Sequence, residues 1–222
     1  MTDVGTDSPS ALLIVNGDCH ESALARCRQL NTDLLIAVDG GLRHCLLLGN
    51  PPDVLIGDLD SATASELESL DGSHTEIIRY QTEKDQTDLE LALEYAQSRN
   101  VTHLTLAGVS GGRTDQMLCN WLLLGQARWN FSIDVIDDTG CGYLVLADQS
   151  RRIAVESGVT ISLMSLTQSA AGVTTDGLKY PLTDAELPLG SSLGISNVAC
   201  GNEFLISISQ GVLLAYVNNG SL

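Results

Sequence analysis

The chain has 222 residues, of which 44% are hydrophobic, so it can bury one large core or two modest ones and is not disordered. Its 28 acidic against 11 basic residues give a formal net charge of −17, which argues against nucleic acid or an anionic membrane as a partner. The polar start lacks the pattern of a signal peptide, and no apolar run is long enough to cross a bilayer, so we expect a cytoplasmic protein. The six cysteines form no Cys-x-x-Cys pair, which favours buried free thiols over a zinc or redox site.

The first part of the chain alternates apolar strand-like runs with helix-like runs. We expect strands at residues 11–15, 33–38, 53–56, 75–80, 101–107 and 131–136. The intervening segments predict helices at residues 22–30, 62–70, 83–99 and 115–128 and another ending at residue 48, with Ser61 or Thr63 capping the helix at 62–70 and Thr82 capping the helix at 83–99. This alternation is typical of β-α-β units and predicts an α/β domain with a mainly parallel sheet and helices on both faces.

The pattern changes between Asp137 and Arg151. Beyond this point, short alternating runs are separated by Gly, Asn, Asp and Pro, and no segment has a convincing helical pattern. The runs lie at residues 143–146, 152–155, 159–166, 172–175, 193–198, 203–208 and 212–217. They predict an antiparallel β-sandwich or barrel-like domain. We therefore expect an α/β domain at residues 1-142, followed by an all-β sandwich domain at residues 143-222.

A glycine-rich turn follows the strand expected at residues 101–107. Gly111 and Gly112 allow the backbone to approach a ligand closely, and Arg113 stands at a helix start, where free N–H groups favour an anion. These features suggest a phosphate site, although neither the P-loop nor the dinucleotide fingerprint is present. Residues 108–112 also match the Gly-x-Ser-x-Gly motif of serine hydrolases, but all four histidines precede Ser110, so the order of the catalytic triad fails. A tight turn without a ligand is the simplest alternative.

Carboxylates follow two of the predicted strands. Asp39 ends the strand at 33–38, and Asp58 and Asp60 follow the strand at 53–56. If their segment is extended, Asp58 and Asp60 point to the same side, and paired hard oxygen ligands suit Mg²⁺. Asp60 alone is better explained as a helix cap. Because ligands of parallel sheets bind beyond the carboxyl ends of the strands, the group of three favours a metal or substrate site.

A second acidic pair opens the helix expected at residues 83–99. Asp85 and Asp88 are three residues apart and would share a face of its first turn, with Lys84 available for a phosphate. Acids at a helix N-terminus are also favoured by the helix dipole, and from the spacing alone this structural explanation is the better one. Arg113 and Asp115 flank Thr114 at a helix start, where an exposed ion pair is the simplest explanation. If a phosphoryl group binds at the glycine turn, Arg113 would instead stabilise its developing charge.

Six short segments of the chain resemble, in order and spacing, the motifs of thiamine pyrophosphokinases. Four are in the first part of the chain: Asp39-Gly40-Gly41, residues 57–61, residues 84–88 and residues 111–115. Two are in the second: residues 177–182, Gly-Leu-Lys-Tyr-Pro-Leu, and residues 194–197, Gly-Ile-Ser-Asn. The resemblance extends from about Asp39 to the C-terminus.

The resemblance implies transfer of pyrophosphate from ATP to the hydroxyl of thiamine with Mg²⁺, giving thiamine diphosphate and AMP. It also implies a homodimer with the thiamine pocket at the subunit interface. By motif, the expected Mg²⁺ ligands are Asp58, Asp60, Asp85 and Asp88, and the expected catalytic residues are Asp58, Asp85, Asp88, Arg113 and Asp115. The expected ATP-binding residues are Asp39, Gly40, Gly41, Asp60, Ser61, Lys84, Gly111 and Gly112, and the expected thiamine-binding residues are Tyr180, Ser196 and Asn197.

Three positions depart from the family pattern. Tyr180 stands where some members carry Trp, Gln116 where many bacterial members carry His, and residues 198–200 where an acidic or aromatic residue is commoner. Two other functions remain open. One is a pyrophosphokinase for a different hydroxymethyl acceptor, such as a pterin, and the other is a non-catalytic sensor of thiamine or nucleotide.

Overall fold

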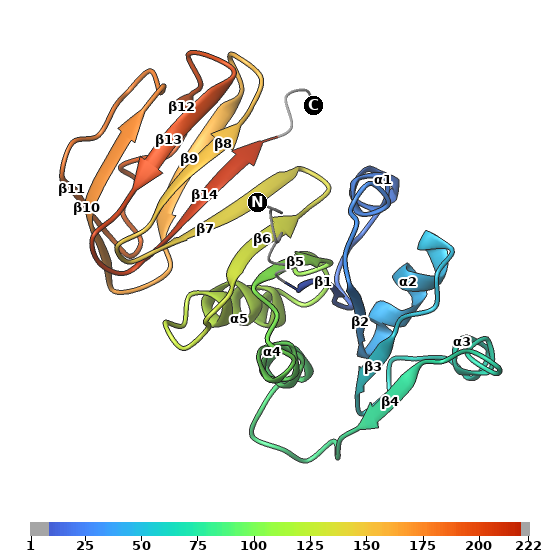
Figure 1. Cartoon of the computed structure of the whole chain (residues 1–222). Coiled ribbons are helices and arrows are strands. Elements are labelled where there is room, and N and C mark those ends of the chain that lie inside the picture. Colours follow the sequence, from blue (N-terminus) through green and yellow to red (C-terminus); the bar gives the residue numbers. More distant parts are fainter. Residues whose placement is uncertain (1–8, 219–222) are drawn as a thin grey trace, which may run out of the picture. The chain divides into compact units, whose positions relative to one another are not determined.

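A computed structural model describes residues 9–218 (Figure 1). Their contacts divide them into two compact units. The first contains the chain up to Gly112 together with Asn130–Ile133, and the second contains Arg113–Trp129 and the chain from Asp134 onward. The domain limits of 1-142 and 143-222 stay a prediction.

The first unit is built on a parallel sheet with the strand order β5-β1-β2-β3-β4. Its strands are β1 (Ser10–Ile14), β2 (Leu34–Val38), β3 (Val54–Gly57), β4 (Glu76–Arg79) and β5 (His103–Ala107). The central strands are buried on both faces, as Leu13, Ile36 and Leu55 illustrate with no exposed surface. This double burial explains why the strands read as continuous apolar runs.

Helices cover both faces of this sheet. A 3₁₀ turn, η1 (Asp39–Gly41), precedes α2, and the helices are α1 (Glu21–Cys27), α2 (Leu42–Leu48), α3 (Ala64–Glu68) and α4 (Asp88–Ser98). The first three connect successive strands from β1 to β4, whereas α4 returns from β4 to β5. Right-handed crossovers therefore put α4 on the opposite face, as Figure 1 shows.

The start of α4 differs from the sequence prediction. The helix begins at Asp88 with Thr87 as its N-cap, whose side chain accepts a hydrogen bond from the Glu90 N–H. The expectation of a helix from residue 83 capped by Thr82 is therefore wrong, and Asp85 lies in the preceding turn rather than in the first helical turn with Asp88. Residues 83–86 include good helix formers and so suggested an earlier start, but the Thr-x-x-Glu pattern at residues 87–90 is the stronger signal for a helix N-terminus. For α3, Thr63 rather than Ser61 is the cap, and it forms a capping box with Glu66.

The second unit contains helix α5 (Thr114–Leu124) and two antiparallel sheets. Strand order is β12-β9-β14-β7-β6 in one sheet and β11-β10-β13-β8 in the other. The strands are β6 (Ser132–Ile136), which the second unit includes from Asp134 on, β7 (Gly140–Leu146), β8 (Ser150–Ala154), β9 (Thr160–Ser165), β10 (Ser169–Asp176), β11 (Ala185–Pro188), β12 (Asn197–Val198), β13 (Glu203–Ser207) and β14 (Val212–Asn218).

One hydrophobic core joins these two sheets. Leu163 and Leu213 enter it from the first sheet, and Phe204 and Ile206 enter it from the second. The α/β region followed by an antiparallel two-sheet region confirms the predicted fold class. The prediction for the second region is wrong in two details. Strand β11 was not expected. Of the strand expected at residues 193–198, only Asn197–Val198 forms, because glycine and serine residues turn the chain before it.

The cysteines and the helices bear on two further expectations. All six cysteines are free thiols, as expected, with Cys19, Cys27 and Cys45 buried but Cys119 and Cys200 exposed. Within residues 9–218, no helix has both the length and the apolar character needed to span a membrane.

Candidate active site

Three carboxylates converge at the carboxyl ends of the adjacent strands β2 and β3. Asp39 directly follows β2, and Asp58 and Asp60 follow β3. One oxygen from each of the three lies within 4.8 Å of the others, and Asp39 is only 9% exposed. We refer to Asp39, Asp58 and Asp60 as the carboxylate cluster.

The backbone that builds this cluster is unusual. Leu59, whose side chain is buried, has φ of 65°, so the segment from Asp58 to Asp60 is not extended, and the condition under which the two carboxylates would point to the same side is not met. Asp39 has φ of 48°. Positive φ at two non-glycine residues stores strain of a kind that concentrates at functional sites. A β-carbon at Gly57 would lie 3.1 Å from the Asp39 Cβ, so glycine allows the two strand ends to approach.

Ser61 joins the two sides of the carboxylate cluster. Its backbone N–H donates to Asp39 Oδ1 at 3.4 Å, and its hydroxyl donates to Asp60 Oδ1 at 3.1 Å. The Asp60 N–H in turn donates to Asp58 Oδ1 at 3.2 Å. These bonds restrict the directions in which the carboxylates can point.

Lys84 and Asp88 lie beside the cluster. Lys84 Nζ is 2.9 Å from Asp88 Oδ1, and both side chains are mostly buried, at 17% and 22% exposed. Burial raises the pKa of Asp88, the nearby charges of Asp58 and Asp39 raise it further, and Lys84 opposes them. Burial also acts to raise the pKa of Asp58, but hydrogen bonds from the Asp60 N–H and Thr82 and the charge of Lys84 hold that pKa below its usual value.

The structure therefore gathers most of the expected ATP-side residues of the first unit. Asp39, Asp58, Asp60, Ser61, Lys84 and Asp88 are linked by these contacts and charges. Asp85 is exposed, and no ion pair of Asp85 is recorded within residues 9–218. Thr82, expected only as a helix cap, instead contributes to lowering the pKa of Asp58, and no sequence pattern indicated this.

The glycine-rich turn after β5 packs against the turn after β1, Asn16–Gly17–Asp18. The Gly17 N–H donates to the Gly108 carbonyl at 2.8 Å, and the Asp18 N–H donates to the Ser110 carbonyl at 2.7 Å. Gly111 has φ of 81°, and a β-carbon there would meet the Asp18 carboxylate at 2.1 Å. Asn16 and Asp18 were not among the expected site residues, although their position just beyond the carboxyl end of β1 was an available signal.

Gly40 and Gly41 have a packing role in the same region. A β-carbon at Gly41 would lie 2.1 Å from the Ile14 carbonyl oxygen, and one at Gly40 would lie 2.3 Å from Asn16 Oδ1. These two glycines let the segment after β2 lie directly on the end of β1. From α2, His44 Nε2 lies 2.9 Å from the Gly17 carbonyl, so this nitrogen carries the proton and donates.

Arg113 and Asp115 belong to the second unit, where they bind each other. Arg113 Nη2 and Nε lie 2.6 and 3.2 Å from the two Asp115 oxygens, and both side chains are about two-thirds exposed or more, at 70% and 68%. Hydrogen bonding to Arg113 lowers the pKa of Asp115. The structure thus contains the exposed ion pair that was one of the two alternatives for these residues.

The expected thiamine-side residues form a local arrangement in the second unit. Asn197 is buried at 3% exposed, its Oδ1 accepts from the Tyr180 N–H at 3.0 Å, and its Nδ2 donates to the Tyr180 carbonyl at 2.7 Å. The Tyr180 side chain itself is 59% exposed. Ser196, with φ of 59°, donates its N–H to Ser162 Oγ at 3.2 Å. Asn197 therefore fixes the backbone that presents Tyr180.

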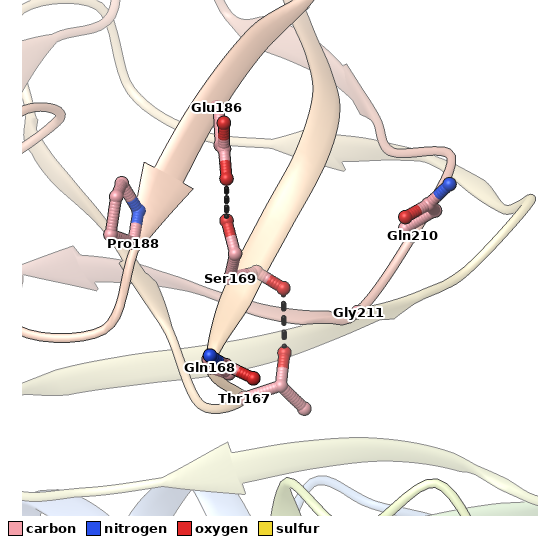
Figure 2. Close-up of a pocket in the computed structure, with 7 residues that line it drawn as sticks. All are labelled: Thr167, Gln168, Ser169, Glu186, Pro188, Gln210 and Gly211. Carbon is pink, nitrogen blue, oxygen red and sulfur yellow. Dashed lines mark hydrogen bonds between the residues drawn. The ribbon is translucent and has the colours of Figure 1, made fainter.

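A separate open pocket of about 500 Å³ lies in the second unit (Figure 2). It is lined by Thr167, Gln168, Ser169, Glu186, Pro188, Gln210 and Gly211, none of which was an expected site residue. Figure 2 shows that some of its polar groups bond each other: Ser169 Oγ donates to Glu186 at 2.8 Å, and Thr167 Oγ1 donates to the Ser169 carbonyl at 3.0 Å. We assign this pocket no role.

Comparison with known proteins places both parts of the chain in one family. Residues 28–136 match the thiamin pyrophosphokinase catalytic domain, and residues 149–213 match the thiamin pyrophosphokinase vitamin B1 binding domain. A thiamine pyrophosphokinase of Bacillus subtilis is 32% identical over 189 residues, covering 82% of this chain and 85% of its own.

Solved structures agree with this match. The crystal structure of thiamine pyrophosphokinase from Bacillus subtilis has a TM-score of 0.81 and 27% identity, covering 96% of this chain and 100% of its own. That of thiamin pyrophosphokinase from Geobacillus thermodenitrificans has a TM-score of 0.79 and 25% identity, covering 96% and 98%. The chain belongs to the thiamine pyrophosphokinase family.

Proposed function

We propose that the protein transfers a pyrophosphoryl group from ATP to the hydroxyl of thiamine, releasing AMP and thiamine diphosphate. The observation that carries this proposal is the convergence of Asp39, Asp58 and Asp60 within 4.8 Å, beside Lys84 and Asp88. Family membership supplies the acceptor, because the matched relatives are named for thiamine.

The carboxylate cluster fits a divalent cation with hard oxygen ligands. Two oxygens on opposite sides of Mg²⁺ are about 4 Å apart, so small adjustments of the three side chains would let them share one ion. Mg²⁺ would neutralise the triphosphate, which otherwise meets an excess of negative charge here. We propose Asp39, Asp58 and Asp60 as ligands, with Asp88 as a further ligand or the general base. Asp85 keeps its predicted role only by motif.

The remaining residues of the first unit suit positioning and charge neutralisation. A primary alcohol is a weak nucleophile, and attack on the β-phosphorus needs alignment more than covalent catalysis. The raised pKa of Asp88 makes its carboxylate a better proton acceptor than an ordinary Asp, which suits a base for the thiamine hydroxyl. Lys84 supplies a cation, and Gly111 and Gly112 offer backbone close to a phosphate.

Residues of the second unit complete the proposal. Arg113 would exchange its exposed partner Asp115 for the transferred group, which an exposed pair allows at little cost. Tyr180 and Ser196 would contact thiamine. The exposed apolar side chains Leu189, Leu193 and Ile195 would be covered in the proposed homodimer.

The direct test is incubation of the purified protein with Mg-ATP and thiamine while AMP and thiamine diphosphate are measured together. Equal formation of both products, abolished by EDTA, is the expected result. AMP release with a hydroxymethylpterin but not with thiamine would indicate the other acceptor class. Tight thiamine or nucleotide binding without any AMP would indicate a sensor.

A further inference from the structure

Ser61 is the residue through which the two sides of the carboxylate cluster are joined, so the groups that hold Ser61 also set the shape of the cluster. Its N–H and hydroxyl bind Asp39 and Asp60, as described above. Its carbonyl oxygen accepts a hydrogen bond of 2.8 Å from Arg43 Nη2. Arg43 is in α2, the helix that follows Asp39 directly along the chain.

Arg43 is itself held from a second direction. Its Nε lies 3.7 Å from Glu66 Oε1, and the Glu66 side chain is only 19% exposed. The other Glu66 oxygen, Oε2, accepts from the Thr63 N–H at 2.7 Å in the capping box of α3. The pKa of Glu66 is lowered mainly by this Thr63 bond and also by Arg43, consistent with a fixed, ionised partner. Glu66 thus anchors the guanidinium that binds Ser61.

We propose that Arg43 is a positioning residue for the carboxylate cluster. By fixing the Ser61 carbonyl, it keeps the Ser61 N–H on Asp39 and the Ser61 hydroxyl on Asp60, and so keeps the three carboxylates at a separation that one cation can bridge. The inference rests on the metal site proposed above. Arg43 makes no recorded contact with Asp39, Asp58 or Asp60 within the described residues, and it acts through Ser61.

Removal of Arg43 would change cation affinity in opposite directions, depending on whether its charge or its positioning of Ser61 dominates. The guanidinium is a positive charge close to a cation site, so Coulomb's law alone predicts that its loss strengthens cation binding. Loss of a partner that orients metal ligands typically weakens metal affinity by about 10- to 100-fold. The sign of the change therefore separates the two effects.

The experiment measures Mn²⁺ binding to the full-length protein without nucleotide, from the free Mn²⁺ signal in electron paramagnetic resonance. We expect Arg43→Met to raise the Mn²⁺ dissociation constant about 10-fold. Arg43→Lys keeps the charge but cannot bind Ser61 and Glu66 with one planar fork, so we expect it to weaken binding as well. Circular dichroism and thermal unfolding establish that each variant is folded.

Arg28→Met is the matched control. Arg28 also joins a carboxylate, that of Glu21, to a backbone carbonyl, that of Leu47 at 3.1 Å, and it lies in the same unit. Its loss removes the same charge and should change Mn²⁺ affinity by less than about 2-fold. Unchanged or tighter Mn²⁺ binding by both folded Arg43 variants would overturn the proposal. Absence of Mn²⁺ binding by the wild-type protein would instead refute the metal site, and the role of Arg43 with it.

Discussion

The carboxylate cluster and the Tyr180 segment use polar side chains in opposite ways. In the cluster, one oxygen from each of Asp39, Asp58 and Asp60 lies within 4.8 Å of the others, so their negative charges repel one another. Around Tyr180, the buried amide of Asn197 bonds to the backbone, and the aromatic side chain is left exposed. The first region gathers negative charge and the second exposes an aromatic ring, which suits the proposed metal–phosphate site and the proposed thiamine site respectively.

The backbone around the carboxylate cluster also differs from that around Tyr180. Positive φ occurs at Asp39 and Leu59 in the first region and at Ser196 in the second. Near the cluster the strain comes with glycines that admit neighbouring strand ends, as Gly57 and Gly41 do. Near Tyr180 the chain is fixed by hydrogen bonds to buried Asn197. The comparison predicts that charge changes damage the first region and that loss of hydrogen bonds damages the second.

The largest effect is expected from Asp58→Asn. The change removes one charge from the proposed metal site and should lower kcat/KM by about 100- to 1000-fold, measured as AMP release, with the fold retained. Asp71→Asn is the matched control, because it makes the same chemical change at an exposed acid of the same unit outside the cluster. We expect a loss of less than about 2-fold there. Equal losses in both variants would show that the effect of Asp58→Asn is not specific to the carboxylate cluster.

Asp88→Asn tests the consequence of the raised pKa. Because the folded-state pKa lies above the unfolded value, ionised Asp88 costs folding free energy at neutral pH, and acidification through the folded-state pKa removes that cost. The variant should therefore have little activity but a free energy of unfolding at least equal to that of the wild type near pH 7. The advantage should shrink as the pH falls from neutral through the folded-state pKa toward the ordinary Asp value of 3.8.

Urea unfolding of both proteins across this range measures the difference directly. Groups that do not interact with Asp88 cancel in it, so the remaining pH dependence belongs to Asp88 and to the charges that act on it, those of Lys84, Asp58 and Asp39. A variant that is less stable than the wild type at neutral pH, and that recovers on acidification, would show that the Lys84 ion pair outweighs burial.

Much of the first region was predictable from the sequence. Continuous apolar runs identified β1, β2 and β3, and the rule that ligands bind beyond strand ends selected Asp39, Asp58 and Asp60 before any geometry was known. The contacts that shape the cluster were not predictable, because Arg43 bonds to Ser61, and Ser61 to Asp39, through individual hydrogen bonds between segments distant in sequence. Such bonds leave no periodic pattern.

The second region was less predictable for a different reason. Its strands are short, and turn residues rather than apolar periodicity set their ends, so β11 went unrecognised and residues 193–196 were taken as strand. Asn197 was expected to contact thiamine. In the structure its amide groups bond to the Tyr180 backbone, a role that sequence spacing does not reveal because residues 180 and 197 meet only in the folded chain.

A smaller effect, confined to one substrate, is expected from Tyr180→Ala. Removal of the exposed ring that we propose to contact thiamine should raise the KM for thiamine about 10-fold and leave the KM for ATP within about 2-fold. Tyr180→Phe keeps the ring and should retain most of the affinity. A KM for ATP that rises as much as that for thiamine would contradict a role on the acceptor side.

The smallest effect on catalysis is expected from Asn197→Ala, which should mainly lower the free energy of unfolding. The substitution leaves the partly buried N–H and C=O of Tyr180 without the Asn197 side chain as a partner, at a cost of about 1–3 kcal/mol in the free energy of unfolding. Exposed Asn202→Ala in the same unit is the control and should be nearly neutral. Mn²⁺ affinity should not change, because the hydrogen bonds that shape the carboxylate cluster all come from the first unit. A variant as stable as the wild type would mean that water replaces the amide and that Asn197 is available to a ligand.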